Sequence, residues 1–245
     1  MGVNIGIEVS DLHKRMKTTP ALAGVSTRFE PGTLHGLIGP DGAGKTTLMR
    51  LLMGLLKPDA GTIRFFDDGA ETPFARVREH VAYMPQQQSL YPDLSVGEHL
   101  DFFRDLYRIP SPVYRERREE LLRLARLTEF ADRPAAKLSG GMYKKLGLLC
   151  ALLRSPAVIL LDEPTNGVDP ISRRELWDLL YRQVEAGVLI LLSTAYMDEA
   201  ERCGKVHVLD GGALLASGEP REVLAKERAE SFEELFMRRE KSATK

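Results

Sequence analysis

The stretch that most constrains this chain is the glycine-rich segment at residues 39–46, Gly-Pro-Asp-Gly-Ala-Gly-Lys-Thr. A short apolar run, Leu34–Ile38, precedes it, and leucines at helical spacing follow it over Thr47–Leu55, with Leu55 closing the apolar face. The order predicts a strand, a tight loop and a helix in direct succession. This is the context in which a glycine-rich loop can surround phosphate groups.

The residue types of the loop fit that chemistry. Gly42 and Gly44 permit backbone conformations that a Cβ forbids, so successive amides can turn toward phosphate oxygens, and the helix that follows adds its positive end. Lys45 supplies charge for the outer phosphates, and the Thr46 hydroxyl suits an octahedral Mg²⁺. The alternative is an ordinary glycine-rich turn with a solvated lysine, which the match at every fixed position disfavours. The motif predicts nucleotide contacts at Gly39, Pro40, Asp41, Gly42, Ala43, Gly44, Lys45, Thr46 and Thr47.

Two carboxylates follow a fully apolar strand, Val158–Leu161. Buried parallel strands present side chains at their carboxyl ends, and a carboxylate there needs a partner such as Mg²⁺. We expect Asp162 to hold the metal, directly or through water, and Glu163 to orient or deprotonate the attacking water. The alternative is that both carboxylates only cap a helix predicted from about Ser172.

Two further polar segments lie beside predicted turns. Gln86 follows the strand-like run 80–84 and a proline, and is either part of the site or a plain loop residue. Residues 138–142, Leu-Ser-Gly-Gly-Met, precede a helix predicted through Leu153. Ser139 is a natural N-cap residue, and the two glycines after it let another surface approach closely. Taken alone, this segment is a helix cap.

Composition limits the class of protein. The 245 residues suffice for one large domain, and 43% hydrophobic and 28% charged residues are typical of a soluble globular protein. Lysine plus arginine (34) balance aspartate plus glutamate (35), which argues weakly against a nucleic-acid partner. Cys150 and Cys203 are expected to be reduced thiols in a cytosolic protein without a signal peptide. Since no apolar run approaches the 18 or so residues of a spanning helix, work at a membrane would require another chain to cross it.

The rest of the pattern predicts an α/β chain with a helical insertion. Short strands are expected over Ile5–Val9 and at residues 25–29, separated by Lys14–Ala23, which is polar and lacks aromatic side chains. From about Val96 to Arg126 the pattern is helical, with one apolar face from Val96 to Leu106 and a second helix expected around residues 121–127. A charged helical tail, expected to be peripheral, begins near Pro220.

Taken together, the phosphate loop, Gln86, the Leu-Ser-Gly-Gly segment, the Asp162-Glu163 pair and the turn at residues 166–169 resemble the ATP-binding cassette (ABC) ATPase family over nearly the whole chain. The resemblance is strongest to ATPase components of bacterial type-2 exporters, especially the paired drug-efflux and ribosome-associated kind. It implies a P-loop NTPase core with an antiparallel β subdomain and an inserted α-helical subdomain. The implied division of a single nucleotide-binding domain, 1–245, is a core with the β subdomain at about 1–85 and 157–220, a helical subdomain at 86–156 and a tail at 221–245.

The resemblance also implies ATP and Mg²⁺ as cofactors and a head-to-tail dimer. Each ATP would lie between the phosphate loop of one cassette and Ser139, Gly140 and Gly141 of the other. Gln86 would contact Mg²⁺ or the attacking water and report the nucleotide state to the helical subdomain, which would dock on a membrane-spanning permease. The implied location is the cytoplasm, peripheral on the inner face of the cell membrane.

Three positions depart from the family pattern. Ala195 stands where the family usually has a histidine that contacts the γ-phosphate, and Met142 replaces the usual glutamine of the signature. The segment 14–23 offers no aromatic ring to stack on adenine; Met16 either substitutes by soft apolar contact or is a packing residue. We therefore expect ATP and Mg²⁺ binding with slow hydrolysis, and a complementary cassette that completes the second site. The rival hypothesis is that the Thr194 or Tyr196 hydroxyl compensates and a homodimer is competent.

Three functions are consistent with these residues. The first is a transport ATPase subunit. The second is a soluble cassette ATPase that acts on ribosomes or nucleic acid, and the third is a non-hydrolysing nucleotide sensor. The absence of a second cassette, a coiled-coil insertion and a basic extension disfavours the second function, and Glu163 disfavours the third. The substrate and the choice between homodimer and heterodimer stay open.

Overall fold

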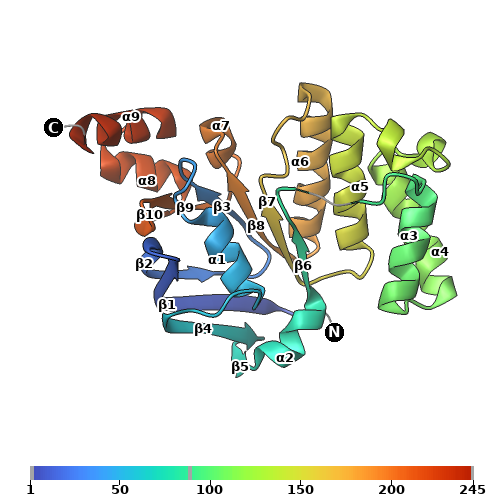
Figure 1. The fold of residues 1–245 in the computed structure, drawn as a ribbon, viewed down its shortest axis with the longest axis horizontal. Coiled ribbons are helices and arrows are strands. Elements are labelled where there is room, and N and C mark those ends of the chain that lie inside the picture. Colours follow the sequence, from blue (N-terminus) through green and yellow to red (C-terminus); the bar gives the residue numbers. More distant parts are fainter. Residues whose placement is uncertain (1–2, 88–89, 244–245) are drawn as a thin grey trace.

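The computed structural model describes residues 3–87 and 90–243. The first layer is a four-stranded antiparallel sheet in the order β2-β1-β4-β5, at the lower left of Figure 1. Its strands are β1 (Ile5–Met16), β2 (Thr19–Phe29), β4 (Ala60–Asp67) and β5 (Ala70–Thr72).

The second layer is a six-stranded sheet in the order β10-β9-β3-β8-β7-β6, parallel except for its β10 edge. Its strands are β3 (Leu34–Ile38), β6 (Val81–Met84), β7 (Val158–Asp162), β8 (Leu189–Thr194), β9 (Lys205–Asp210) and β10 (Ala213–Gly218). Helix α1 (Lys45–Leu52) packs between the two sheets (Figure 1). The carboxyl ends of β3, β7 and β8 therefore lie side by side.

Both faces of the parallel sheet are covered, which explains why its strands are apolar throughout. Alternate residues of β7 belong to different cores: Leu160 packs with α1 and the antiparallel sheet, whereas Leu161 packs with the helices on the other face. Those helices are α3 (Val96–Tyr107), α4 (Ser111–Leu124), α5 (Gly140–Leu152), α6 (Pro170–Glu185), α7 (Met197–Ala200), α8 (Pro220–Glu227) and α9 (Phe232–Ala243). The remaining short helices are α2 (Phe74–Val77), η1 (Arg78–His80), η2 (Thr128–Phe130) and η3 (Ala135–Lys137).

The structure confirms the predicted P-loop α/β core, the antiparallel sheet and the helical insertion, which forms the right-hand part of Figure 1. The two helices predicted from Val96 onward are confirmed as α3 and α4; Ser95 caps α3 with a capping box, and Arg108 ends it in the left-handed conformation. Leu106, at the end of α3, is 58% exposed although it shares the apolar spacing.

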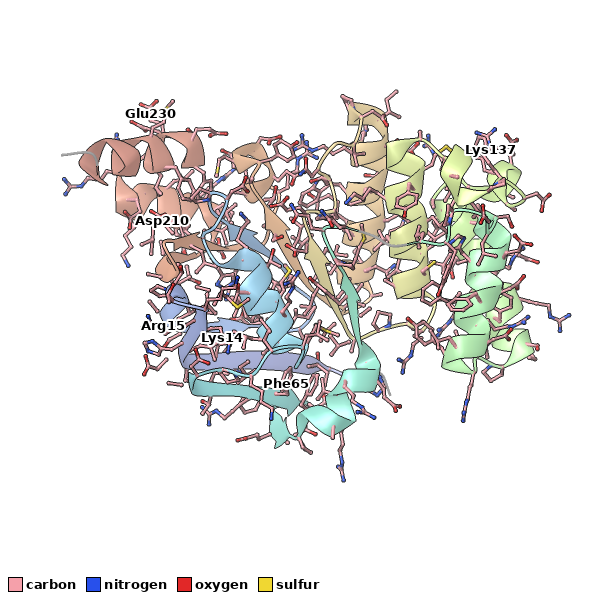
Figure 2. All side chains as sticks on the ribbon, in the orientation of Figure 1. Lys14, Arg15, Phe65, Lys137, Asp210 and Glu230 are labelled. Carbon is pink, nitrogen blue, oxygen red and sulfur yellow. The ribbon has the colours of Figure 1, made fainter. Side chains whose placement is uncertain are left out.

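Two predictions are wrong in detail. The helix after the phosphate loop ends at Leu52, and Leu55 lies beyond Gly54 with 61% of its surface exposed. The polar segment 14–23 is a β-hairpin, because Lys17 adopts a positive φ and turns β1 directly into β2. Lys14 pairs with Asp59 (Nζ to Oδ1 2.7 Å), and Lys14 and Arg15 lie at this end of the sheet in Figure 2.

The charged tail is not peripheral. Val223 of α8 and Phe232 and Leu235 of α9 are buried and belong to the same apolar core as the helices on the sheet. Their wide spacing among charged residues conceals this packing in the sequence. Residues 88–89 of the predicted helical subdomain and 244–245 of the predicted tail lie outside the described residues.

One buried carboxylate fixes α7 to its neighbours. Glu199 has no exposed surface, and three donors surround it: Arg173 Nε at 2.7 Å, Trp177 Nε1 at 3.3 Å and Thr165 Oγ1 at 3.0 Å. The donors come from α6 and from the loop after β7. Thr165 lies two residues after Glu163, so its hydrogen bond to Glu199 helps to fix the loop that carries Glu163.

Candidate nucleotide-binding site

The glycine-rich loop joins β3 to α1, as predicted, and two of its glycines have no room for a side chain. Gly44 adopts φ 103° at the start of α1, and a Cβ there would lie 2.4 Å from the carbonyl oxygen of Ala21. A Cβ at Gly39 would lie 2.1 Å from the carbonyl oxygen of Leu209. Since such separations are far below van der Waals contact, the β1–β2 hairpin and β9 clamp the loop in its present shape.

Lys45 is turned into the loop and is 5% exposed. Its ammonium group donates to the carbonyl oxygens of Gly39 (2.7 Å) and Pro40 (3.0 Å) and lies 3.9 Å from Glu163 Oε1. Burial lowers the pKa of Lys45, while the nearby carboxylates of Glu163, Asp41 and Asp162 act in the opposite direction. Its hydrogen bonds to two backbone carbonyls hold a cation at the point where phosphate oxygens are expected.

Asp162 ends β7 with 1% of its surface exposed. Ser193 Oγ of β8 donates to its Oδ1 at 2.6 Å, and Tyr83 Oη of β6 donates to its Oδ2 at 3.3 Å. Both partners are neutral hydroxyls, so these contacts orient the carboxylate without neutralising it. The alternative that Asp162 and Glu163 cap the next helix is wrong, because Asp169 accepts from the first amides of α6.

Glu163 has a strained backbone conformation. Its φ of 48° lies in the left-handed region, which costs about 1–3 kcal/mol for a side-chain-bearing residue. Its amide donates to Ser193 Oγ at 3.0 Å, which helps to hold this conformation. Two amide groups donate to Oε2 of the carboxylate: Gln86 Nε2 at 2.7 Å and Asn166 Nδ2 at 3.3 Å.

Lys45, Gln86 and Glu163 line one hollow of about 330 Å³, whereas Asp162 and Asn166 lie outside its lining. The structure therefore brings together Gln86, Glu163 and most of the predicted phosphate loop, whereas Gly39 and Pro40 contribute through the carbonyls that hold Lys45. Ala21 of β2 also lines the hollow. The lining residues are Ala21, Asp41, Gly42, Ala43, Gly44, Lys45, Thr46, Thr47, Gln86 and Glu163.

A smaller hollow of about 170 Å³ adjoins it where the family pattern expects a histidine. It is lined by Ala195 together with Glu163 and Tyr196, among others, so the missing side chain leaves space directly beside the carboxylate. The Tyr196 hydroxyl donates to Asn166 Oδ1 at 3.4 Å. The Thr194 hydroxyl is occupied in accepting from the Tyr196 amide at 3.0 Å. Neither hydroxyl has a hydrogen bond to Glu163 among the described residues.

The Ser-Gly-Gly segment lies outside both hollows. Ser139 caps α5, its Oγ accepting from the Met142 amide at 3.3 Å, as predicted. A Cβ at Gly141 would lie 2.4 Å from Ser172 of α6, so this glycine allows α5 to pack against the start of α6. The segment is thus not part of the chain's own phosphate site.

The oxygen atoms beside the phosphate loop are suitable ligands for Mg²⁺. The Thr46 hydroxyl, the Asp162 carboxylate and the Gln86 amide oxygen are the hard oxygen ligands that this ion prefers, and Asp162 carries a charge that its two hydroxyl partners leave uncompensated. Among residues 3–87 and 90–243, no group of three or more His, Cys, Asp or Glu side chains could hold a metal. A cation here would therefore share its coordination with phosphate oxygens and water.

Several site residues escaped sequence reasoning. Ser193 and Tyr83 orient Asp162, Asn166 contacts Glu163, and Lys144 of α5 donates to the Gln86 carbonyl at 3.0 Å. No motif contains Lys144 or Tyr83, and their roles depend on strand and helix packing that spacing does not reveal. Ser193 was recognisable only as a polar residue at the end of a buried strand, which is the signal that identified Asp162.

The phosphate loop, the buried carboxylate at the end of the neighbouring strand and the sheet topology define a P-loop nucleotide-binding domain. The family model for ABC transporters matches residues 22–166, and the chain belongs to this family of ATP-binding cassette ATPases.

Related proteins agree with this assignment. The chain is 45% identical over 234 residues to the probable multidrug ABC transporter ATP-binding protein YbhF of Escherichia coli, covering 92% of this chain and 39% of that protein. It is 39% identical over 222 residues to the Nod factor export ATP-binding protein I of Ralstonia nicotianae, covering 90% of this chain and 69% of the relative. The chain thus spans about two fifths of the YbhF length.

A solved structure of an ATP-binding subunit of an ABC transporter matches the fold with a TM-score of 0.82 and 31% identity, covering 95% of this chain and 98% of that one. Within the described part of the chain, no helix has the length and apolarity needed to span a membrane.

Proposed function

We propose that this chain is the ATP-binding subunit of an export system, which binds MgATP at a dimer interface and drives transport through a separate permease. The observation that carries the proposal is the convergence of Lys45, Gln86 and Glu163 on one hollow at the phosphate loop. Two relatives named as multidrug and Nod factor export ATP-binding proteins support export as the process. The names do not identify a substrate for this chain.

In the proposed site, the loop amides and Lys45 bind the phosphates, while Thr46, Asp162 and Gln86 hold Mg²⁺. When bound, Mg²⁺ would neutralise charge on the outer phosphates. Glu163 accepts a proton from the attacking water or orients it, and the amides of Gln86 and Asn166 hold the carboxylate in place. Met16 is 43% exposed at the end of β1, so it is not a core residue, and we propose it as the apolar contact for the base.

The Ser139–Gly141 segment supports the proposed dimer. It lies at the start of α5 and outside the chain's own hollow, yet offers a hydroxyl, backbone amides and a helix N-terminus. We propose that it contacts the ATP bound to a second cassette. The proposed division of the chain is then a core with β subdomain at about 1–85 and 157–220, a helical subdomain at 86–156 and a tail at 221–245.

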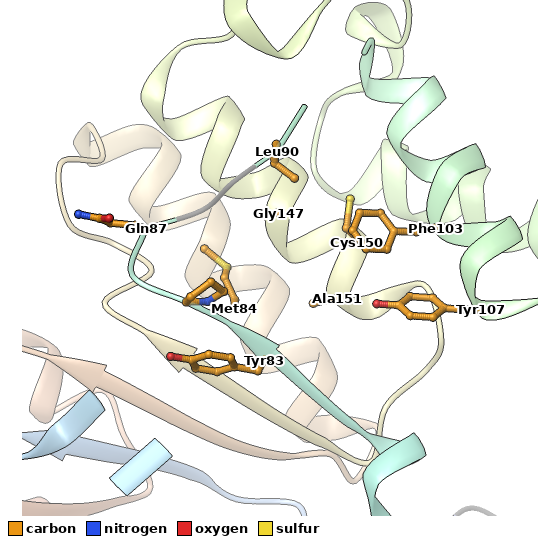
Figure 3. A pocket seen from close by; sticks show the side chains of 10 residues that line it. Tyr83, Met84, Gln87, Leu90, Phe103, Tyr107, Gly147, Cys150 and Ala151 are labelled. Carbon is orange, nitrogen blue, oxygen red and sulfur yellow. The ribbon is translucent and has the colours of Figure 1, made fainter. Parts of the chain in front are cut away.

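The surface proposed for the permease lies on the helical subdomain. A cavity of about 280 Å³ lies between β6, α3 and α5. Figure 3 shows the rings of Tyr83, Phe103 and Tyr107 in its lining. Leu106 is exposed on α3 nearby. Gln87, which directly follows Gln86, and Leu90 also line this cavity. Docking there would keep the cassette peripheral on the inner face of the membrane.

The permease proposal is tested by membrane retention of the tagged chain in cells that produce its partners. Leu106→Glu is expected to release the chain from the membrane fraction, because it places a charge at the apolar contact. Leu55→Glu is the matched control, since Leu55 is equally exposed but follows α1. Equal retention of both variants would contradict the assigned surface.

The ATPase proposal is tested by ATP binding and steady-state hydrolysis of the purified chain, with Glu163→Gln as the background. We expect ATP binding with hydrolysis close to that background, because Ala195 has no polar side chain at the position where the family pattern places a histidine. Glu201→Gln, an exposed carboxylate outside the site, is the matched control. Rapid hydrolysis that depends on Glu163 would refute the hypothesis of slow hydrolysis and favour a competent homodimer. A failure to bind ATP would refute the proposed ATP-binding function.

A further inference from the structure

A cavity of about 480 Å³, here called the α6 cavity, lies along one face of α6 and shares no lining residue with the two hollows at the phosphate loop. Pro170, Arg173, Trp177 and Tyr181 recur in its lining at the spacing of one helical face. Arg202, which follows α7, adds to the lining from a second segment. From Pro170 to Tyr181 a helix rises about 16 Å, the length of about five residues of extended peptide.

The three arginines of the α6 cavity differ in their partners. Arg173 donates to Asp198 (Nη2 to Oδ2 2.8 Å) and to buried Glu199, so the charge of its guanidinium is compensated. Arg174 and Arg202 are exposed and form no ion pair with any residue that the structure describes. Two guanidinium groups at this cavity therefore have positive charge that the described chain does not neutralise.

Arg202 is held in place by two residues of α6. Its guanidinium lies 5.6 Å from the centre of the Trp177 ring, and its backbone oxygen accepts from Tyr181 Oη at 3.3 Å. Trp177 is 1% exposed, so its indole is a fixed support for the cation. A cation–π contact orients a guanidinium and leaves its N–H donors free for an acceptor. Arg202 is thus positioned before any ligand binds.

The lining favours a carboxylate-bearing peptide over other anions. Guanidinium groups bind carboxylates through paired N–H donors, and Val168 and Pro170 add apolar surface for a side chain. Asp178, the one carboxylate among the lining residues, offers an acceptor for peptide N–H groups and would repel a continuous row of phosphates. The chain has 34 basic and 35 acidic residues, so no net positive charge recruits nucleic acid or an anionic membrane.

We propose that the α6 cavity binds an extended acidic segment of a partner protein, with carboxylates of that segment paired to Arg174 and Arg202 and an apolar side chain against Val168 and Pro170. This interaction uses no residue of the nucleotide site or of the surface assigned to the permease. It therefore does not depend on the proposed function.

The test is binding of a synthetic peptide, Glu-Leu-Glu-Glu-Leu-Glu with blocked ends, to the full chain. Emission of Trp177, the one tryptophan of the chain, reports on the cavity, and anisotropy of the fluorescein-labelled peptide gives an independent dissociation constant. We expect saturable binding of this peptide and none of its glutamine counterpart up to about 1 mM. Arg174→Met and Arg202→Met should each weaken binding about tenfold or more.

Arg182→Met is the matched control, because Arg182 is an exposed arginine of α6 outside the cavity lining. This variant should bind the peptide as the wild type does. Equal weakening by Arg182→Met and Arg174→Met would show a diffuse attraction to surface charge and overturn the proposal. Retention of ATP binding by each variant is the control for folding, and a wild type that binds the peptide but not ATP would refute only the proposed function.

The remaining outcomes also decide against the acidic peptide. Absence of saturation, or equal binding of the glutamate and glutamine peptides, would overturn the proposal. Inorganic phosphate and vesicles of phosphatidylglycerol are tested in parallel with the same variants. Binding of either one, but not of the peptide, that is lost in Arg174→Met and Arg202→Met would assign the cavity to a phosphate group instead.

Discussion

Removal of the Glu199 carboxylate should destabilise the fold far more than removal of its neighbour. Glu199→Ala deletes the acceptor for Arg173, Trp177 and Thr165 in a fully buried position. Asp198→Ala deletes an exposed carboxylate that pairs with the same guanidinium at 2.8 Å. Both variants remove one negative charge beside Arg173, so a difference in their stability reports the effect of burial.

The magnitude follows from the three donors. An unpaired buried donor costs about 1–3 kcal/mol, and breaking a buried ion pair about 3–5 kcal/mol. In Glu199→Ala, Arg173 is still partly exposed and still pairs with Asp198, so the cost of its lost contact with Glu199 lies at the low end of this range. We expect Glu199→Ala to lower the free energy of unfolding by about 3–5 kcal/mol, and Asp198→Ala by less than about 1 kcal/mol.

Urea unfolding provides the assay. Trp177 is the only tryptophan of the chain and itself donates to Glu199, so its fluorescence reports on this site, while circular dichroism reports on the whole fold. At this chain length the loss corresponds to about 10 °C in Tm. Glu199→Gln, which keeps one acceptor oxygen, should lie between the two alanine variants. Equal stability of Glu199→Ala and Asp198→Ala would refute the assignment of Glu199 as a buried anchor.

Three further predictions concern other parts of the chain. His35 and His207 are buried side by side (Nδ1 to Nε2 3.0 Å), and desolvation lowers the pKa of His35 from 6.5 to about 4 and that of His207 to about 3. Because the unfolded chain then binds more protons than the folded chain below pH 6.5, the free energy of unfolding should fall by about 2 kcal/mol per histidine between pH 6.5 and 5. Urea titrations across this range measure the loss, and a flat profile would contradict the prediction. Ala195→His should raise ATP turnover about tenfold or more, since the imidazole enters the hollow that Glu163 lines. No gain would count against the hypothesis that the site hydrolyses ATP slowly. Gly44→Ala should lower the free energy of unfolding by several kcal/mol, because the strain of a positive φ adds to a 2.4 Å contact between the new Cβ and a carbonyl oxygen. In Gly42→Ala the new Cβ meets no atom within 4 Å, so the same denaturation assay should show a loss of about 1 kcal/mol.

The sequence was sufficient for the parts of the molecule that local chemistry determines. The phosphate loop lies between a strand and a helix because its glycines and flanking apolar runs allow little else, and Ser139 caps α5 as its residue type indicates. The fully apolar run before Asp162 predicted a buried parallel strand, which the structure confirms.

Features that depend on long-range packing could not be predicted. Leu55 and Leu106 have core spacing but lie past or at the end of their helices, where no partner surface covers them. The burial of Phe232 follows from tertiary contacts of a segment that is charged on average. Likewise, Lys144 reaches Gln86 across 58 residues of sequence, and no periodicity encodes that contact.

The position of β3 in the sheet has a consequence for how the chain matures. The strand is made early, yet both of its hydrogen-bonding neighbours, β8 and β9, come more than 150 residues later. During synthesis, the strand that ends in the phosphate loop therefore lacks both neighbouring strands until the chain has been made through β9. A fragment ending at residue 166 would contain the loop, the signature and both carboxylates but could not assemble their scaffold. Nucleotide binding would thus require synthesis through β9, and a chain that terminates before β8 should be insoluble rather than partly active.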